Sequence, residues 1–167
     1  NTMTEKAGVG SEGVIGLSFV YPGTARTFKW DVAADLPNSE DDTVYIRLQA
    51  NDGTSDGGIA TSGAFTIDTK APVISGVSSA QTISTHNVIV GYTLTDLSNS
   101  DIELNISSDG GLDWDVATST VSGDIGDNVS PGSGKSITWN AGADFNNQEV
   151  STVKSKVRAV DAFGNIG

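Results

Sequence analysis

Strict alternation of apolar and polar positions is the main pattern along this chain. It runs through residues 43–51, 87–95 and 102–106, whose apolar members are Val44, Ile46, Leu48, Ala50, Val88, Val90, Tyr92, Leu94, Ile102, Leu104 and Ile106. A period of two predicts β-strands with one buried face and one solvated face. No stretch carries apolar residues at helical spacing over three turns, so we expect an all-β fold.

The pattern and the turn residues predict the following strands: 14–20, 27–30, 43–51, 60–68, 73–79, 87–95, 102–106, 114–121, 135–140 and 152–160. Residues 1–13 are small and polar and predict a loose end, and residues 31–43 predict an acidic loop. Residues 52–58 predict a hairpin loop because they are rich in Gly and Asp.

Residues 30–52 and 139–161 are two copies of one element, 139 − 30 = 109 residues apart. Nine of their 23 paired positions are identical, including Trp30 with Trp139 and Asp35 with Asp144. Average residue usage would give roughly one or two identities. The chain is therefore interpreted as a repeat protein. Ser155 replaces Ile46 on the apolar face, so we expect it near a sheet edge or bonded to another hydroxyl.

A joint between two units is predicted at residues 68–72, because Pro72 restricts the residue before it and begins an edge strand. The units are then 1–70 and 71–167. At a spacing of 109, the return strand 61–68 has its counterpart at 170–177, and the first unit lacks counterparts of 73 to about 109. We therefore expect the first unit to lack its early strands and the second its last. Either the sequence is a window of a longer array, or neighbouring chains complete the units.

Composition narrows the function classes. The formal net charge is −12, from 21 acidic and 9 basic residues. This excess argues against nucleic acids and anionic membrane surfaces, which need clustered Lys and Arg. There is no Cys, so disulfides, thiolate metal sites and cysteine nucleophiles are excluded. Neither a signal peptide nor a membrane-spanning segment is visible in the sequence.

Several segments carry a resemblance to a known family: 107–114 (SSDGGLDW), 123–126 (GDIG), 131–135 (PGSGK), 139–144 (WNAGAD) and the exit 65–72 (FTIDTKAP). The chain resembles the immunoglobulin-like and fibronectin type III-like tandem repeats of bacterial secreted and cell-surface proteins. The resemblance implies tandem β-sandwiches and a structural role as stalk, adhesin spacer, or filament or surface-layer subunit.

The same resemblance implies an extracellular or cell-surface location in a bacterium or archaeon. The implied partners are neighbouring repeats or copies of the same protein. A glycan- or protein-binding accessory module of a secreted enzyme or adhesin is the alternative, because such repeats serve several roles.

Four carboxylates, Asp68, Asp96, Asp101 and Asp161, are expected near the joint between the units, which suggests a calcium site. Calcium takes six to eight oxygen ligands from such loops. The competing interpretation is that these residues favour turns and cap backbone N–H groups.

Other candidate groups have a plain structural explanation. Residues 107–114 are similar to an Asp-box hairpin, in which the Asp caps a turn and the Trp packs beneath it. Trp30, Trp114 and Trp139 would suit a sugar platform, although core packing is favoured. His86 is the only histidine and no catalytic partner stands at diagnostic spacing, so we expect no enzyme activity.

Overall fold

The computed structural model describes residues 3–6, 10–18 and 21–167. The chain divides into two compact units, 1–70 and 71–167. The expectation of an all-β chain is confirmed, since antiparallel strands dominate and both helices have four residues. The first unit contains α1 (Val32–Asp35), β1 (Glu40–Val44), β2 (Arg47–Asn51), β3 (Asp56–Thr61) and β4 (Phe65–Asp68). The second contains β5 (Val73–Gln81), β6 (Asn87–Thr95), β7 (Ser100–Ser107), β8 (Val121–Gly123), β9 (Gly126–Val129), β10 (Gly132–Asn140), α2 (Ala141–Asp144) and β11 (Lys154–Asp161).

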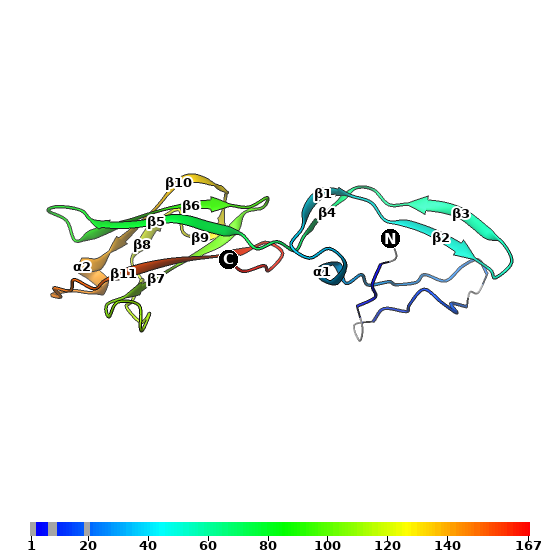
Figure 1. Cartoon of the computed structure of the whole chain (residues 1–167), viewed down its shortest axis with the longest axis horizontal. Helices are drawn as coiled ribbons and strands as arrows, with labels where there is room; N and C mark the ends of the chain where they lie inside the picture. Colours follow the sequence, from blue (N-terminus) through cyan, green and yellow to red (C-terminus); the bar gives the residue numbers. More distant parts are fainter. Residues whose placement is uncertain (1–2, 7–9, 19–20) are drawn as a thin grey trace. The chain divides into compact units, whose positions relative to one another are not determined.

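The second unit has two antiparallel sheets, with strand orders β5-β6-β10-β8 and β11-β7-β9 (Figure 1). Its hydrophobic core draws on both sheets. The buried members are Val90, Tyr92, Leu94, Ile102, Leu104, Ile106, Ile137, Trp139, Val157 and Ala159. The two sheets therefore share one core, as expected for two packed β layers.

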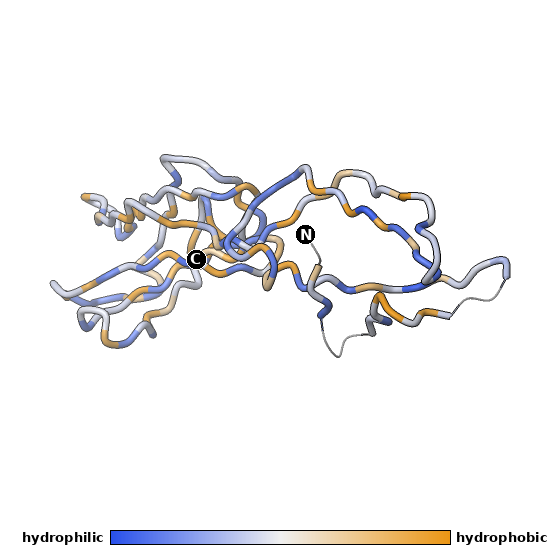
Figure 2. The backbone as a smooth tube through the Cα atoms, turned by 45° about the vertical axis from the view of Figure 1, so that its right-hand side comes forward, coloured by the Kyte–Doolittle hydropathy of each residue, from blue (hydrophilic) through white to orange (hydrophobic). Residues whose placement is uncertain are grey.

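Alternation explains which residues enter this core. From Val90 in β6 and from Ser100 in β7 every second residue is buried, and hydrophobic and hydrophilic residues alternate in short runs along the chain (Figure 2). Tyr92 brings a hydroxyl group into this core, and the hydroxyl donates a hydrogen bond to the carbonyl oxygen of Asp124 at 2.6 Å. Burial, together with the nearby Asp124 carboxylate, raises the pKa of Tyr92 to about 12, so the hydroxyl remains a donor.

The first unit contains a long antiparallel ribbon in which β1 pairs with β4 and β2 with β3. Ile46 bridges the two halves, because its carbonyl oxygen accepts a hydrogen bond from the Ser62 backbone N–H at 2.8 Å. Among the described apolar residues of this unit, Ile67 alone is buried. The described part of the first unit therefore has a much smaller core than the second.

Several sequence expectations are wrong in detail. Residues 14–16 form bends and 17–18 have no regular structure, instead of the expected strand, and residues 19–20 of that prediction lie outside the described part. The segment 27–30 is joined to Glu5 by an isolated bridge at Trp30. The expected loose end is tied down, since Lys6 N–H donates to the Lys29 carbonyl oxygen at 2.9 Å and Glu12 N–H to that of Thr27 at 2.8 Å.

Other strand limits also differ. The expected strand 114–121 reduces to a bridge between Val116 and Ile106, with β8 starting at Val121. The long strand 43–51 begins earlier, at Glu40, and is interrupted between β1 and β2. The return strand 60–68 is likewise two strands, β3 and β4. The two strand pairs also contain register shifts, between Asp41 and Val44 in β1 and between Gln49 and Asn51 in β2, which alternation alone does not reveal.

The helices α1 and α2 were missed by the sequence analysis, because four residues are too few to display a helical period. Within the described residues, no helix is both long and apolar enough to cross a membrane.

Candidate functional site

One local structure occurs in both units. In the first, α1 starts two residues after Trp30, and the Trp30 indole Nε1–H donates to Asp35 Oδ2 at 2.6 Å. In the second, α2 starts two residues after Trp139, whose Nε1–H donates to Asp144 Oδ2 at 3.0 Å. Each Asp ends its helix and holds the indole of the Trp that precedes it.

The chain leaves both helices in the same way. Leu36 N–H donates to the Val32 carbonyl oxygen and Phe145 N–H to that of Ala141, both at 2.8 Å. Two residues further on, Asn38 and Asn147 have φ of 56° and 55°. Asn tolerates this left-handed conformation better than most residues. Segments 30–38 and 139–147 thus adopt one conformation at a spacing of 109 residues.

A threonine completes each copy. Thr4 accepts a hydrogen bond from Asp31 N–H at its carbonyl oxygen (2.8 Å) and donates its own N–H to Asp35 Oδ2 (2.6 Å). Thr120 does the same, with Asn140 N–H at 2.9 Å and with Asp144 Oδ2 at 2.9 Å. Alignment at 109 misses this residue because the two threonines are 120 − 4 = 116 residues apart. We call this Thr, Trp and Asp set the Thr–Trp–Asp cluster.

The hydrogen bonds favour the charged form of both carboxylates. Those from the backbone of Thr120, from its side chain and from the Trp139 indole hold the pKa of Asp144 below its ordinary value, against a smaller opposing effect of burial. The pKa of Asp35 is lowered mainly by the side chain and backbone of Thr4, with help from Trp30. The carboxyl groups of Asp35 and Asp144 are therefore both ionised at neutral pH.

The surroundings of the two clusters differ. Trp139 is 1% exposed and belongs to the core, whereas Trp30 is half-buried. Trp30 borders a pocket of about 660 Å³, which is lined by Met3, Trp30, Asp35, Leu36, Tyr45, Ile46 and Arg47.

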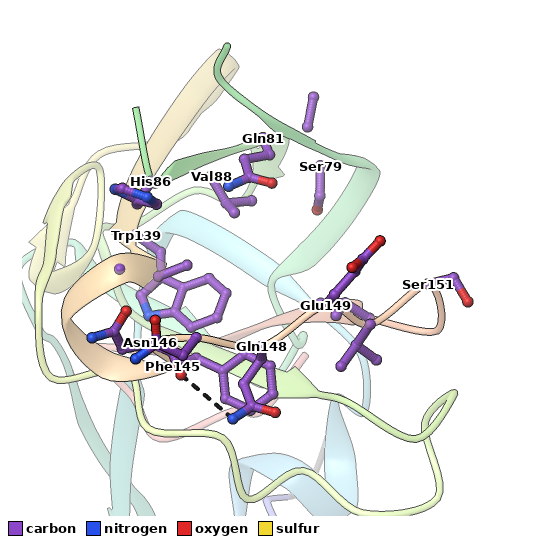
Figure 3. A pocket seen from close by; sticks show the side chains of 16 residues that line it. Ser79, Gln81, His86, Val88, Trp139, Phe145, Asn146, Gln148, Glu149 and Ser151 are labelled. Atoms are coloured by element: carbon purple, nitrogen blue, oxygen red, sulfur yellow. Dashed lines mark hydrogen bonds between the residues drawn. The ribbon is translucent and has the colours of Figure 1, made fainter. Parts of the chain in front are cut away.

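A second pocket, of about 540 Å³, lies beside the second cluster (Figure 3). Its apolar wall contains Trp139, Phe145 and Val88, and residues 146–151 and Val153 form one side. Val150 and Val153 are 36% and 40% exposed. Segment 149–153 is the counterpart of β1 at the 109-residue spacing, yet it is not a strand. This pocket and the segment beside it form the candidate functional site.

The carboxylates suggested for calcium divide between the units. Asp68 ends β4 in the first unit, where it is buried, and its Oδ1 accepts a hydrogen bond from Lys70 N–H at 2.9 Å. In the second unit Asp161 lies opposite Ser100, whose hydroxyl donates to Asp96 Oδ2 at 3.3 Å.

Asp101 is exposed on the opposite face of β7, where its Oδ1 accepts from Asn128 N–H at 2.9 Å. Asp161 caps its own turn by accepting from Phe163 N–H (2.8 Å) and from Asn165 N–H (2.9 Å) and side-chain amide (2.7 Å). Turn capping therefore accounts for Asp161, and a hydrogen bond from the neighbouring strand β9 accounts for Asp101. The calcium hypothesis is tested by thermal unfolding with calcium and with a chelator, where an unchanged Tm excludes it.

The Asp-box-like hairpin has the bonds of a turn device. Asp109 Oδ1 accepts hydrogen bonds from Ser107 Oγ at 2.7 Å and from the backbone N–H groups of Leu112 and Asp113 at 2.9 and 3.0 Å. Trp114 is half-buried, and Lys156 Nζ lies 4.5 Å from its ring centroid. The hairpin is thus held by capping and by a cation–π contact.

His86 is exposed at the turn between β5 and β6, and its carbonyl oxygen accepts from Gly142 N–H at 3.3 Å. It lines the pocket beside Gln81, Val88 and Trp139, but none of the hydrogen bonds found among the described residues joins its ring to a carboxylate or hydroxyl. In the described part of the chain, the His86 ring thus has no partner that would orient it as a general base.

No protein-family model matches this sequence, and searches of curated proteins and of solved structures give no significant match.

Proposed function

We propose that the protein is a structural segment of a tandem array of immunoglobulin-like or fibronectin type III-like β-sandwich modules with a period of about 109 residues. Its role would be that of a stalk, adhesin spacer, or filament or surface-layer subunit, on the surface of or outside a bacterial or archaeal cell. Its partners would be neighbouring modules or further copies of the chain.

The observation that carries the proposal is the duplicated Thr–Trp–Asp cluster. Two segments that share nine of 23 residues also share a helix of four residues, a bond between Trp indole and Asp carboxylate, and a left-handed Asn. Duplication of a module explains this agreement more simply than independent origin.

The strand order of the second unit supports a sandwich of this class. In immunoglobulin-like domains, strands A, B, E and D form one sheet, and strands C, F and G the other. The order β5-β6-β10-β8 corresponds to A-B-E-D, and β11-β7 corresponds to F-C, whereas β9, which follows β8 in the chain, has no counterpart in this scheme. In this correspondence the seventh strand, G, belongs beside β11.

Force spectroscopy on an in-register concatemer tests the array. Three or more copies of residues 59–167 are joined head to tail, so that each joint preserves the period. We expect equal unfolding steps, one per complete module, each releasing about 36–39 nm of chain for 109 residues. Irregular steps, or none, would contradict a modular array.

The alternative, a glycan- or protein-binding accessory module, needs an exposed aromatic or polar surface. Glycan-array binding by the chain, lost on Trp114→Ala and kept on Trp30→Ala, would favour it over a purely structural role.

A further inference from the structure

The outer edge of β11 is largely open. Among the described residues, β11 has one full strand partner, β7, and its other side pairs only at its end. There, Val160 bridges Ile166, while Ala159 and Gly167 exchange two backbone hydrogen bonds of 3.3 and 3.0 Å. A hairpin therefore begins at this end, and the edge from Glu149 to Arg158 continues beyond it.

Beyond the turn, this hairpin continues the register of the ribbon in the first unit. There, Leu48 pairs with Ala60 and Gln49 with Ile59. Adding 109 gives position 157 with 169 and 158 with 168, which continues directly from the observed pair of Ala159 and Gly167. At the turn itself the two hairpins differ by one residue, because Asn51 pairs with Asp56 after a register shift whereas its counterpart Val160 bridges Ile166. The first unit is thus a template for a strand that continues along the open edge.

The ribbon of the first unit indicates which residues of an added strand would pack along the open edge of the second unit. In the first unit, Phe65 lies opposite Val44, and Ile67, only 5% exposed, lies opposite Asp41. The counterparts of Val44 and Asp41 are Val153 and Val150, which remain partly exposed beside the pocket of about 540 Å³. Two apolar residues at alternate positions of an added strand would therefore cover Val150 and Val153 and fill the pocket beside Trp139.

The two polar residues that follow β4, Thr69 and Lys70, also have partners whose counterparts lie beside the pocket of the second unit. The Thr69 hydroxyl donates to the Leu36 carbonyl oxygen at 2.6 Å and accepts from Ser39 N–H at 3.0 Å. Lys70 forms an ion pair with Glu40. The counterparts of Leu36, Ser39 and Glu40 are Phe145, Gln148 and Glu149, and all three line the pocket. A Thr–Lys pair after the apolar positions would find the same types of partner.

We propose that the open edge of the second unit accepts an extended strand with the β4 pattern Phe-x-Ile-Asp-Thr-Lys, which enters beside Gly167 and runs antiparallel to β11 as far as Glu149. This deepens the proposed function and rests on it. The occupant is a strand joined in cis to Gly167, because Gly167 already pairs with Ala159. The β4 strand of a second copy would first have to leave its own partner β1.

The test appends to Gly167 a copy of the twelve residues Ile59–Lys70, which follow Gly58 in the template. Amide hydrogen exchange of residues 149–158 is compared with that of the unmodified chain. We expect exchange there to slow by about tenfold or more, since strand pairing protects edge amides. A control chain carries the same extension with Phe65→Ser and Ile67→Ser in the appended copy, and we expect little protection from it.

Equal protection by both extensions would overturn the proposed sequence pattern, and protection by neither would overturn the proposal. If the extended chain folds poorly, the free peptide Ser62–Lys70 is added to the unmodified chain, and protection of the same amides supports the pattern. Concentration-dependent dimers of the unmodified chain with a protected edge would overturn the cis assignment. Equal unfolding steps in the concatemer without edge protection would remove this inference alone and leave the modular array intact.

Discussion

The Thr–Trp–Asp cluster places two donors on a single carboxylate oxygen. Asp144 Oδ2 accepts from both Thr120 N–H and Trp139 Nε1–H, as Asp35 Oδ2 does from Thr4 and Trp30. Charged acceptors make stronger hydrogen bonds than neutral ones. In each copy the carboxylate thus links a threonine, the end of a helix of four residues and the indole of the preceding Trp.

We expect Asp144→Asn to lower the Tm at pH 7, because the neutral amide is a weaker acceptor for Thr120 and Trp139. The pKa of Asp144 is lowered in the folded state, so its contribution is complete above the unfolded value of about 3.9 and is lost as the pH falls through the folded pKa. The parent chain should therefore lose more Tm than the variant below about pH 4. Thermal unfolding at pH 7, 5 and 3 measures this, with Asp115→Asn, at an exposed position, as the control.

Gly142 in α2 marks a close approach of the turn before β6. A Cβ at this position would lie 2.5 Å from His86 Cβ. Ala would gain roughly 1 kcal/mol of helix propensity over Gly, but overpacking costs roughly 1–3 kcal/mol. We expect Gly142→Ala to destabilise the second unit by about 1 kcal/mol in urea titrations. Gly58→Ala, where nothing lies within 4 Å, should be close to neutral, and equal effects would contradict the argument.

At the scale of elements, alternation predicted the strands that bury one face. Residues 87–95 form β6 over the expected span, and Ser155 bonds to the Ser79 hydroxyl as its position on an apolar face required. Segments whose structure depends on partners far away in sequence were not predictable. Residues 114–121 are irregular, and 149–153 do not form a strand although their counterpart β1 does.

The candidate site was harder to predict from the sequence than the fold was. Trp139 and Asp144 were visible as repeated residues, but the bond between them needs α2, which has too few residues to show a period. Thr120 lies outside the 109-residue alignment. The pocket is lined by residues of β5, β6, α2 and the segment before β11. The apolar–polar pattern within one strand does not show which elements come together in this way.

The two repeated tryptophans should differ in their effect on stability, because burial, not sequence identity, determines the cost of removing a side chain. Trp139→Ala removes a ring that is 1% exposed from the core, which costs about 3–5 kcal/mol. Trp30→Ala removes a half-buried ring and should cost clearly less. Urea titrations followed by circular dichroism measure both, and equal costs would show that Trp30 is as well packed as Trp139.

At the scale of the molecule, the two units differ in how much apolar surface they bury. Ten buried hydrophobic residues form the core of the second unit, whereas Ile67 is the one buried hydrophobic residue in the described part of the first. Conformational entropy opposes folding in proportion to chain length, so a unit with little buried apolar surface is only weakly stable.

We therefore expect the first unit to open at lower denaturant than the second, and limited trypsin digestion to cut it first. Arg47 in β2 is exposed, while Arg158 in β11 lies within the sheet opposite Glu103 and forms an ion pair with it at 2.9 Å. Proteolysis under native conditions reports local opening. The first cuts should therefore fall within residues 1–70, and the segment 71–167 should remain uncut in the early fragments. Mass spectrometry of the early fragments identifies the sites. Cleavage at Arg158 before Arg47 would mean that the open edge of β11, and not the small core of the first unit, is the least stable part of the protein.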